Sequence, residues 1–424
     1  MQPETPLRRV LHQLGRLRYQ LLGGLVFAVC MPVLMRWGLT AQGWTTPTQI
    51  NTLMGSAIAF VAGVFLLREL GGLPGVRRTY YVIPAVALTY LAVLTAFFFL
   101  RIDYNRLQLP LSCALAIIWM FAVYMAAPRF LQFRIGLVPG GDVASLAGLG
   151  QIDWQPLERP VLERGRWDGV AADLRVEHTQ AWERFLADCA LSGVRVFHTK
   201  QLKESLTGRV EIEHLSENTL GSLNPDSTYL KIKQVVDWLV ALATIIVFLP
   251  ITLVIALAIK IDSPGPVFFR QERVGFRGQR FKVLKFRTMT HAPAAQNARE
   301  AAITRKADPR ITRLGHVLRR TRFDELPQVF NILRGEMSWI GPRPEAVPLS
   351  QWYESELPFY RYRHIVRPGI SGWAQVNQGH VAAIDQVLEK LHYDFYYIKN
   401  FSLWLDVLIV MRTIRTVFTG FGAK

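Results

Sequence analysis

Long apolar segments constrain this chain more than any other feature of its sequence. Four of them lie in the first third of the chain, at residues 20–37, 52–67, 80–100 and 109–127. Each approaches the roughly 20 residues that an α-helix needs to cross a bilayer. Because half of the 424 residues are also hydrophobic, the sequence predicts a membrane protein whose residues 1–129 form a four-helix transmembrane bundle.

Arginines beside these segments predict how the bundle is oriented. They gather before the first segment, between the second and third, and after the fourth, whereas the opposite loops carry only Arg36, Arg101 and Arg106. Since basic loops stay on the cytoplasmic side of a membrane, both ends of the bundle are expected to be cytoplasmic. The gathered arginines are Arg8, Arg9, Arg16, Arg18, Arg68, Arg77, Arg78, Arg129 and Arg134.

The formal net charge of the chain is +17. A charge of this size fits two kinds of partner, nucleic acid or an anionic lipid surface. Because the basic residues stand beside apolar segments, we predict contact with anionic membrane lipids and none with nucleic acid. Cys30, Cys113 and Cys189 show no disulfide or metal-binding spacing, so they are expected to be free thiols.

Residues 130–230 have the composition of a water-soluble domain. Strands are expected at residues 134–138 and 194–198, a helix at 182–191, and a tight turn at Pro139-Gly140-Gly141. This alternation predicts a small α/β domain of Rossmann-like type. The glycine pair lacks the full GxGxxG pattern, so we interpret it as a turn and assign the domain no chemistry.

A fifth apolar segment, residues 235–259, is long enough to span the membrane, but Pro250 interrupts it. Proline lacks an N–H donor and its ring clashes with the preceding turn, so it kinks a helix. We therefore expect a re-entrant helix that enters the membrane and returns to the same face, with its break at Pro250. The alternative is a fifth true span that the proline kinks.

The segment after Ile261 is basic and aromatic. Two short strands are expected at residues 267–270 and 281–286, joined through Gly275 and Gly278. Fixed cations of this density suit an anionic substrate such as a pyrophosphate, whereas a solvated surface is the alternative. The cations are Arg270, Arg273, Arg277, Arg280, Lys282, Lys285 and Arg287.

Two adjacent carboxylates, Asp324 and Glu325, follow a run that contains three arginines. Because proline is tolerated in a first helical turn, Pro327 predicts a helix from about Asp324 to Leu333. The helix terminus and the arginines would keep Asp324 ionised and attract phosphate, whereas an ordinary helix cap is the alternative role. Adjacent helical residues diverge by about 100°, so one carboxylate is expected to attack while the other holds a divalent metal.

Further motifs over residues 230–424 support the interpretation of Asp324 and Glu325. They are Lys285-Phe286-Arg287-Thr288-Met289, Asp324-Glu325-Leu326-Pro327-Gln328 with Asn331, Gly335 and Met337-Ser338, Gly341-Pro342-Arg343-Pro344-Glu345, Arg367 through Asn377, and Tyr393-Asp394 through Asp406. The chain thereby resembles the bacterial sugar transferase family, the monotopic polyprenyl-phosphate phosphoglycosyl transferases, in the long form that starts O-antigen or exopolysaccharide synthesis. It departs from the family pattern at Glu336 and by the insertion of Gln378 before Gly379, which affects local loop shape.

The resemblance implies an enzyme that transfers a sugar phosphate from a UDP-sugar to undecaprenyl phosphate in two steps. Asp324 would attack the sugar-bearing phosphate, expel UMP and hold a covalent phosphosugar, and Glu325 would assist through a metal or by proton transfer. Lys285, Arg287 and Arg367 would neutralise phosphates. Arg343 and Glu345 would line the nucleotide and metal site, and the metal, Mg²⁺ or Mn²⁺, would be held by Asp324, Glu325 and Glu345.

The same resemblance bears on topology. UDP-sugars are cytoplasmic, so a catalytic domain at residues 231–424 is expected on the cytoplasmic side of the bacterial inner membrane, which favours the re-entrant helix. Residues 396–418 are expected to form a helix in the membrane interface. The predicted fold is thus a membrane α-helical bundle, a small α/β domain and a mixed, mainly α-helical catalytic domain. A homodimer is left open.

Two other functions are left open. A lipid-linked glycosyltransferase would release UDP in place of UMP, although the sequence has no DxD motif of the kind that many such enzymes use for metal. A non-enzymatic membrane sensor built on the α/β domain would leave the carboxylates, arginines and glycines after Ile261 unexplained. Glucose and galactose are the sugars expected from the resemblance, and N-acetylated sugars are left open.

Overall fold

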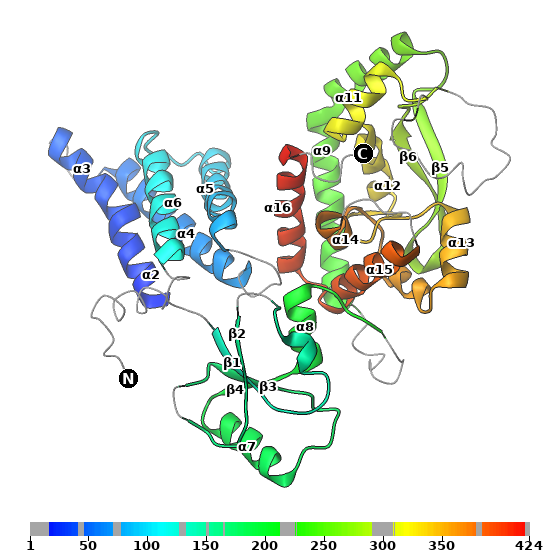
Figure 1. The fold of residues 1–424 in the computed structure, drawn as a ribbon. Helices are drawn as coiled ribbons and strands as arrows, with labels where there is room; N and C mark the ends of the chain where they lie inside the picture. Colours follow the sequence, from blue (N-terminus) through cyan, green and yellow to red (C-terminus); the bar gives the residue numbers. More distant parts are fainter. Residues whose placement is uncertain are drawn as a thin grey trace. The chain divides into compact units, whose positions relative to one another are not determined.

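The chain divides into two units by its internal contacts, Met1–Gly208 and Arg209–Lys424, and Figure 1 colours it from blue to red along the sequence. This division falls after Gly208, whereas the sequence predicted boundaries after residues 129 and 230, which stay predictions. The computed structural model describes residues 17–40, 46–70, 78–126, 133–149, 152–163, 166–212, 225, 227–290, 308, 310–378 and 384–419.

Four apolar helical segments open the first unit. The first is an unbroken helical stretch that contains a π-helical turn, and all four are long and apolar enough to cross a membrane. The predicted segments are therefore confirmed as helices, and the chain is a membrane protein. They are α2 (Leu17–Gly24) with η1 (Leu25–Cys30) and α3 (Met31–Thr40), then α4 (Pro47–Leu70), α5 (Val82–Phe99), which the short turn η2 (Arg78–Tyr81) precedes, and α6 (Gln108–Ala126).

The orientation of these helices stays a prediction. Several of the arginines on which it depends lie outside the described residues, namely Arg8, Arg9, Arg16, Arg77 and Arg129. Within the bundle, the Tyr90 hydroxyl lies 2.8 Å from Ser112 Oγ and joins α5 to α6. Trp119 Nε1 donates to the carbonyl oxygen of Gln20 at 3.1 Å and joins α6 to α2. Because lipid offers no hydrogen-bond partners, such bonds favour one arrangement of the helices.

A four-stranded parallel sheet follows the bundle in the chain. Its strands are β1 (Phe133–Leu137), β2 (Ile152–Pro156), β3 (Gly169–Ala172) and β4 (Arg195–His198), in the order β2-β1-β3-β4. The turn η4 (Ala144–Leu146) and helix α7 (Gln180–Leu191) lie in its connections, and α8 (Thr199–Thr207) follows β4. The strands and helix that the sequence predicted here are confirmed, and a parallel sheet with helical connections is what an α/β domain requires. Gly140 and Gly141 form the predicted turn with φ of 121° and 62°.

The second unit begins with one long helix, α9 (Ser227–Asp262), and a β-hairpin. The hairpin strands β5 (Phe268–Val274) and β6 (Arg280–Phe286) are antiparallel and are joined by η6 (Phe276–Gly278). They confirm the two predicted strands and extend the first to Val274. The later elements are α11 (Arg313–Thr321), η7 (Phe323–Gln328), α12 (Val329–Leu333), β7 (Ser338–Ile340), α13 (Val347–Glu356), η8 (Tyr360–Ile365), β8 (Gly369–Ser371), α14 (Trp373–Asn377), α15 (Ile384–Lys399) and α16 (Leu403–Thr419).

Helix α9 continues through Pro250 without leaving the α-helical conformation. Residues on both sides of the proline pack on the same unit. Ala241 belongs to a buried cluster with side chains of β6 and α12, and Ile255 and Ile259 belong to a second cluster with side chains of β6 and α11. The two halves of α9 are therefore held by one folded body, and a membrane dip at Pro250 stays a prediction.

The side of α9 that faces away from the unit is apolar and exposed. Leu239, Ile246, Val254 and Ile261 expose between 54% and 79% of their surface. An apolar helix face of this length on a folded unit is a surface suited to lipid.

The C-terminal segment differs from its prediction. The sequence predicted one helix over residues 396–418, but α15 ends at Lys399 and α16 begins at Leu403. The Phe401 side chain is buried at the break, against Tyr397 and Tyr229. Helix α16 buries Leu408 and Ile409 and exposes Trp404, Val410 and Ile414, so its amphipathic character is confirmed.

Candidate active site

The two adjacent carboxylates lie in the turn η7. Arg322 precedes it in the left-handed backbone conformation, with φ of 62°, and ends α11. The sequence predicted an α-helix from Asp324 to Leu333, whereas the structure has a 3-10 turn as far as Gln328 and α-helix only from Val329. Pro327 explains the difference, because proline disfavours the α conformation of the residue before it.

Glu325 is surrounded by three cations from three segments. Its Oε1 accepts a hydrogen bond from Lys285 Nζ at 2.7 Å and from Arg343 Nη2 at 3.1 Å, and Arg322 Nη1 lies 3.8 Å away. Burial alone would raise the pKa of Glu325, but Lys285 and Arg343 outweigh it and hold the pKa below the ordinary glutamate value. Glu325 is therefore a fixed anion inside the unit.

Asp324 has a different environment from its neighbour. It is 8% exposed, and among the described residues no donor reaches its Oδ1. Burial raises the pKa of Asp324, and the anionic Glu325 raises it further, although Lys285 acts in the opposite direction. A buried carboxylate oxygen without a hydrogen bond is costly in a folded protein and is often explained by a functional role. The two carboxylates thus have separate environments, as the sequence predicted.

Lys285 reaches the carboxylates from β6, where it pairs with Phe269 of β5. Burial lowers the pKa of Lys285 to about 8, although Glu325 favours its charged form. Asn331 of α12 fixes β6 beside η7, since its Oδ1 accepts from the Leu284 N–H at 3.0 Å and its Nδ2 donates to the Lys282 carbonyl at 2.9 Å. Lys285 is thereby held within reach of Glu325.

The loop Gly341–Glu345 brings Arg343 to the same cluster. Its first residue must be glycine, because a Cβ at Gly341 would lie 2.3 Å from the Arg367 carbonyl oxygen. Arg273 of β5 donates to the Pro344 carbonyl at 2.5 Å. Glu345 does not join Asp324 and Glu325 but forms an ion pair with Lys390 of α15. Lys390 contributes to a pKa of Glu345 below its ordinary value, against the effect of burial.

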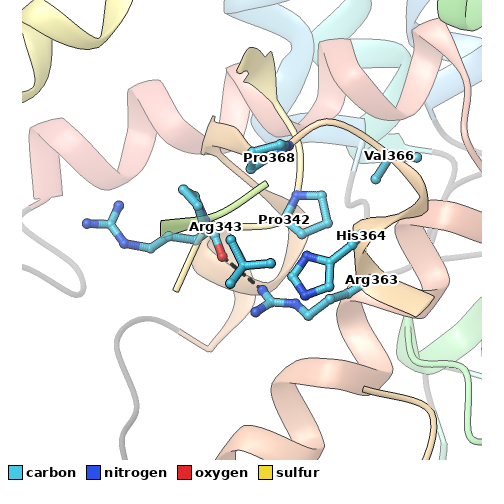
Figure 2. A pocket seen from close by; sticks show the side chains of 8 residues that line it. Pro342, Arg343, Arg363, His364, Val366 and Pro368 are labelled. Atoms are coloured by element: carbon cyan, nitrogen blue, oxygen red, sulfur yellow. Dashed lines mark hydrogen bonds between the residues drawn. The ribbon is translucent and has the colours of Figure 1, made fainter. Parts of the chain in front are cut away.

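A small pocket opens beside this loop, with room for about one water molecule. Figure 2 shows Arg343 and Pro342 on one side of it and Arg363 and His364 on the other, with a dashed line from the Arg363 guanidinium to the Arg343 carbonyl oxygen. Among the described residues His364 Nε2 has no hydrogen-bond partner. Burial, together with the neighbouring Arg363, lowers the pKa of His364 to about 3, so its imidazole is neutral at pH 7.

Two predicted phosphate ligands lie elsewhere. Arg287 is buried and donates to the carbonyl oxygens of Ser263 at 2.6 Å and Pro264 at 2.7 Å, where it caps the C-terminal end of α9. Arg367 donates to the Gly335 carbonyl at 3.0 Å and stacks over the Phe276 ring at 4.9 Å. Their assignment to substrate phosphates stays a prediction that these contacts do not favour.

Comparison with known proteins identifies the family of the chain that carries this cluster. Residues 228–420 match the family described as bacterial sugar transferase, a range that contains every residue of the cluster. An Aeromonas hydrophila protein named UDP-N-acetylgalactosamine-undecaprenyl-phosphate N-acetylgalactosaminephosphotransferase is 47% identical over 405 residues, which cover 95% of this chain and 94% of that protein. The chain belongs to the bacterial sugar transferase family. This membership excludes the non-enzymatic membrane sensor.

Two further relatives of this transferase match less than half of the chain. A UDP-glucose:undecaprenyl-phosphate glucose-1-phosphate transferase of Xanthomonas campestris pv. campestris is 42% identical over 196 residues, 46% of this chain and 40% of that protein. The Escherichia coli (strain K12) protein of the same name is 43% identical over 189 residues, 44% of this chain and 39% of that protein. These two matches are shorter than the match to the Aeromonas hydrophila protein, which covers 95% of the chain.

The divalent metal that the family resemblance implies can be tested against the side chains present. Across the described ranges no three His, Cys, Asp or Glu side chains gather into a metal-binding group, and Glu345 is neutralised by Lys390. Mg²⁺ often uses only one or two carboxylates together with substrate phosphates. Asp324, whose Oδ1 has no described hydrogen-bond partner, and the neighbouring Glu325 fit that pattern, although Glu325, like Glu345, is already paired with cations. The predicted metal ligands Asp324, Glu325 and Glu345 stay a prediction.

Around the cluster, Arg322 was predicted as one of the arginines beside Asp324, whereas Asn331, Lys390 and Asp394 had no predicted role of their own. Arg322 lies 3.8 Å from Glu325, and Asn331 bonds to the main chain of Lys282 and Leu284. Lys390 and Asp394 lie one turn apart on α15 and are buried. The sequence signal that could have found Lys390 and Asp394 is their spacing of four residues in a helix rich in aromatic residues. Such a charged pair is seldom buried without a partner elsewhere.

Proposed function

We propose that this transferase moves a sugar 1-phosphate from a UDP-sugar to undecaprenyl phosphate and releases UMP. The observation that carries the proposal is the pair of carboxylates in η7, where Glu325 is held by cations while Asp324 Oδ1 is buried and has no partner among the described residues. An enzyme that only bound phosphate would need the cations alone. A free carboxylate beside them supplies a nucleophile.

The first step forms a bond between Asp324 Oδ1 and the phosphorus that carries the sugar. The bond from that phosphorus to the bridging oxygen of UMP breaks, and UMP leaves with the electron pair. In the second step a phosphate oxygen of undecaprenyl phosphate forms a bond to the same phosphorus, and the Asp324 carboxylate leaves. Lys285 and Arg343 lie where they would neutralise charge on the phosphate oxygens.

A divalent cation, Mg²⁺ or Mn²⁺, would be held by Asp324 and Glu325 together with the diphosphate, and it would stabilise negative charge on the phosphate oxygens. Glu325 is already neutralised by Lys285 and Arg343. It therefore acts first as the anchor that keeps these two cations beside Asp324.

The proposed donor is UDP-N-acetylgalactosamine. The relative that carries this sugar in its name matches 95% of the chain, including the bundle and the α/β sheet. The Xanthomonas campestris and Escherichia coli relatives named for glucose match less than half of it. We therefore propose this sugar in place of glucose and galactose, which the family resemblance favoured.

The proposed location is the bacterial inner membrane with the catalytic unit in the cytoplasm. Asp237 of α9 accepts a hydrogen bond from Ser338 Oγ at 2.5 Å, and Ile259 near the other end of α9 packs on Phe286. A helix whose two ends contact the same polar unit does not carry that unit to the opposite side of a bilayer. This supports a helix that dips into the cytoplasmic leaflet and returns.

The test is nucleotide release by the purified full-length protein with undecaprenyl phosphate, Mg²⁺ and a panel of UDP-sugars. UMP release that is fastest with UDP-N-acetylgalactosamine is the expected result. Release of UDP would instead identify a glycosyltransferase that moves the intact sugar. Faster UMP release with UDP-glucose would retain the reaction and reject the proposed donor.

A further inference from the structure

Two residues of α15 hold the Gly341–Glu345 loop, one directly and one through Arg363. Lys390 forms an ion pair with Glu345. Asp394, one turn later, accepts two hydrogen bonds from Arg363, from Nε at 3.1 Å and Nη2 at 2.8 Å. Asp394 is 1% exposed and Arg363 3% exposed. The face of α15 that carries both residues is therefore buried against the loop and η8.

The guanidinium of Arg363 is shared among three partners. Besides Asp394, it donates from Nη1 to the Tyr360 hydroxyl at 2.7 Å and from Nη2 to the main-chain carbonyl of Arg343 at 2.9 Å. The last of these bonds, drawn in Figure 2, reaches the residue whose side chain contacts Glu325. A continuous path of bonds thus runs from Asp394 through Arg363 and Arg343 to Glu325.

We propose that the Asp394–Arg363 pair positions Arg343 for the transfer reaction, so that Arg363 and Asp394 are positioning residues that touch no substrate. The inference rests on the proposed function. Burying two charges costs desolvation, so such a pair is weak evidence for stability and is better explained by the geometry that it fixes. Arg343 has one described bond to Glu325, at 3.1 Å, and a loop displacement of about 1 Å would break it.

The arrangement also explains why the loop needs a support on this side. Arg343 and Lys285 both converge on Glu325 Oε1, and Arg273 stands close enough to lower the pKa of Lys285. Lys285 and Arg343 repel each other whereas Glu325 attracts both, so the position of Arg343 depends on where its loop is held. The bonds of Arg363 and Lys390 fix this loop to η8 and α15.

The test is a double-mutant cycle with Asp394→Asn and Arg343→Lys, read from the rate of lipid-linked product formation at saturating donor. Asp394→Asn alone is expected to lower kcat by about 10²-fold, the loss typical of a 1 Å misplacement, with KM for the UDP-sugar close to wild type. In the Arg343→Lys background the same substitution is expected to have little further effect. Rate losses that multiply would overturn the proposal, because Asp394 would then act independently of Arg343.

Asp406→Asn is the matched control, since it breaks another buried ion pair of this unit, between Lys233 and Asp406 at 2.7 Å, that does not touch the loop. It is expected to lower the apparent Tm and leave kcat of the folded enzyme close to wild type. If Asp394→Asn lowers Tm in the same way and leaves kcat unchanged, the pair is merely structural and the proposal is wrong.

Arg363→Lys replaces Asp394→Asn if the latter does not fold, because lysine retains a cation beside Asp394 but cannot also reach the Arg343 carbonyl. It is expected to show the same loss of kcat and the same lack of additivity, and a wild-type kcat would overturn the proposal. The formation of lipid-linked product measures the rate of every variant in the cycle, whether the enzyme releases UMP or UDP. A wild-type enzyme that releases UDP would therefore reject the proposed reaction without deciding the role of Asp394.

Discussion

The exchange of each carboxylate in η7 for its amide separates a catalytic role from a structural one. Asp324→Asn removes a charge whose Oδ1 has no donor among the described residues. Since burial raises the pKa of Asp324, the charged form is disfavoured there, and the neutral amide is expected to leave the apparent Tm unchanged or slightly higher. An amide cannot act as the nucleophile, so UMP release is expected to disappear.

Glu325→Gln is the matched change one residue later, with the opposite effect on stability. It leaves Lys285 and Arg343, which lie 2.7 Å and 3.1 Å from Glu325 Oε1, as buried cations without their anion. Removing one partner of a buried ion pair costs about 3 kcal/mol. For a unit of this size that cost corresponds to a fall of about 6–12 °C in apparent Tm.

The measurements are thermal unfolding of the detergent-solubilised protein and UMP release in a single turnover without acceptor. Intact-protein mass spectrometry after mixing with donor should show the phosphosugar on the wild type and not on Asp324→Asn. The reasoning is refuted if folded Asp324→Asn keeps near-normal UMP release. It is also refuted if Asp324→Asn loses as much thermal stability as Glu325→Gln.

Three further predictions concern pH, metal and topology. Activity should fall in acid at a pH above the ordinary aspartate range, because protonated Asp324 does not attack, and should fall above about pH 8, where Lys285 loses its proton. A pH profile of UMP release for Lys285→Arg should show the alkaline limb moved upward, and an unmoved limb would contradict the assignment to Lys285. Excess chelator should abolish UMP release and added Mg²⁺ should restore it, because a divalent cation would bridge the diphosphate and the few carboxylates of the site. Full activity in chelator would show that the reaction needs no metal. Single cysteines at Ser227 and Ser263, in a background without Cys30, Cys113 and Cys189, should both resist a membrane-impermeant thiol reagent added outside spheroplasts, and labelling at position 263 alone would show that α9 spans the membrane.

The sequence alone determined the features that depend on local pattern. Runs of apolar residues are sufficient to predict transmembrane helices, because the bilayer sets their length and composition. Alternation and turn residues located the strands of the hairpin and, in the parallel sheet, the strands β1 and β4 but not β2 and β3. The motif around Asp324 and Glu325 identified the family, and the divergence of adjacent helical residues predicted that the two carboxylates have different surroundings.

The tertiary structure decided which charged groups meet. Glu325 is paired with Lys285 and Arg343, which lie 40 and 18 positions away in the chain. Glu345, which the family motifs place near Glu325 in the sequence, is paired instead with Lys390. Arg287, predicted as a phosphate ligand, donates to the carbonyls of Ser263 and Pro264, because the hairpin places it beside the residues that follow α9. The pairing of a charge depends on which distant segment folds against it, and local sequence carries no record of that. Only the folded unit shows that Asp324 Oδ1 is buried without a hydrogen-bond partner among the described residues.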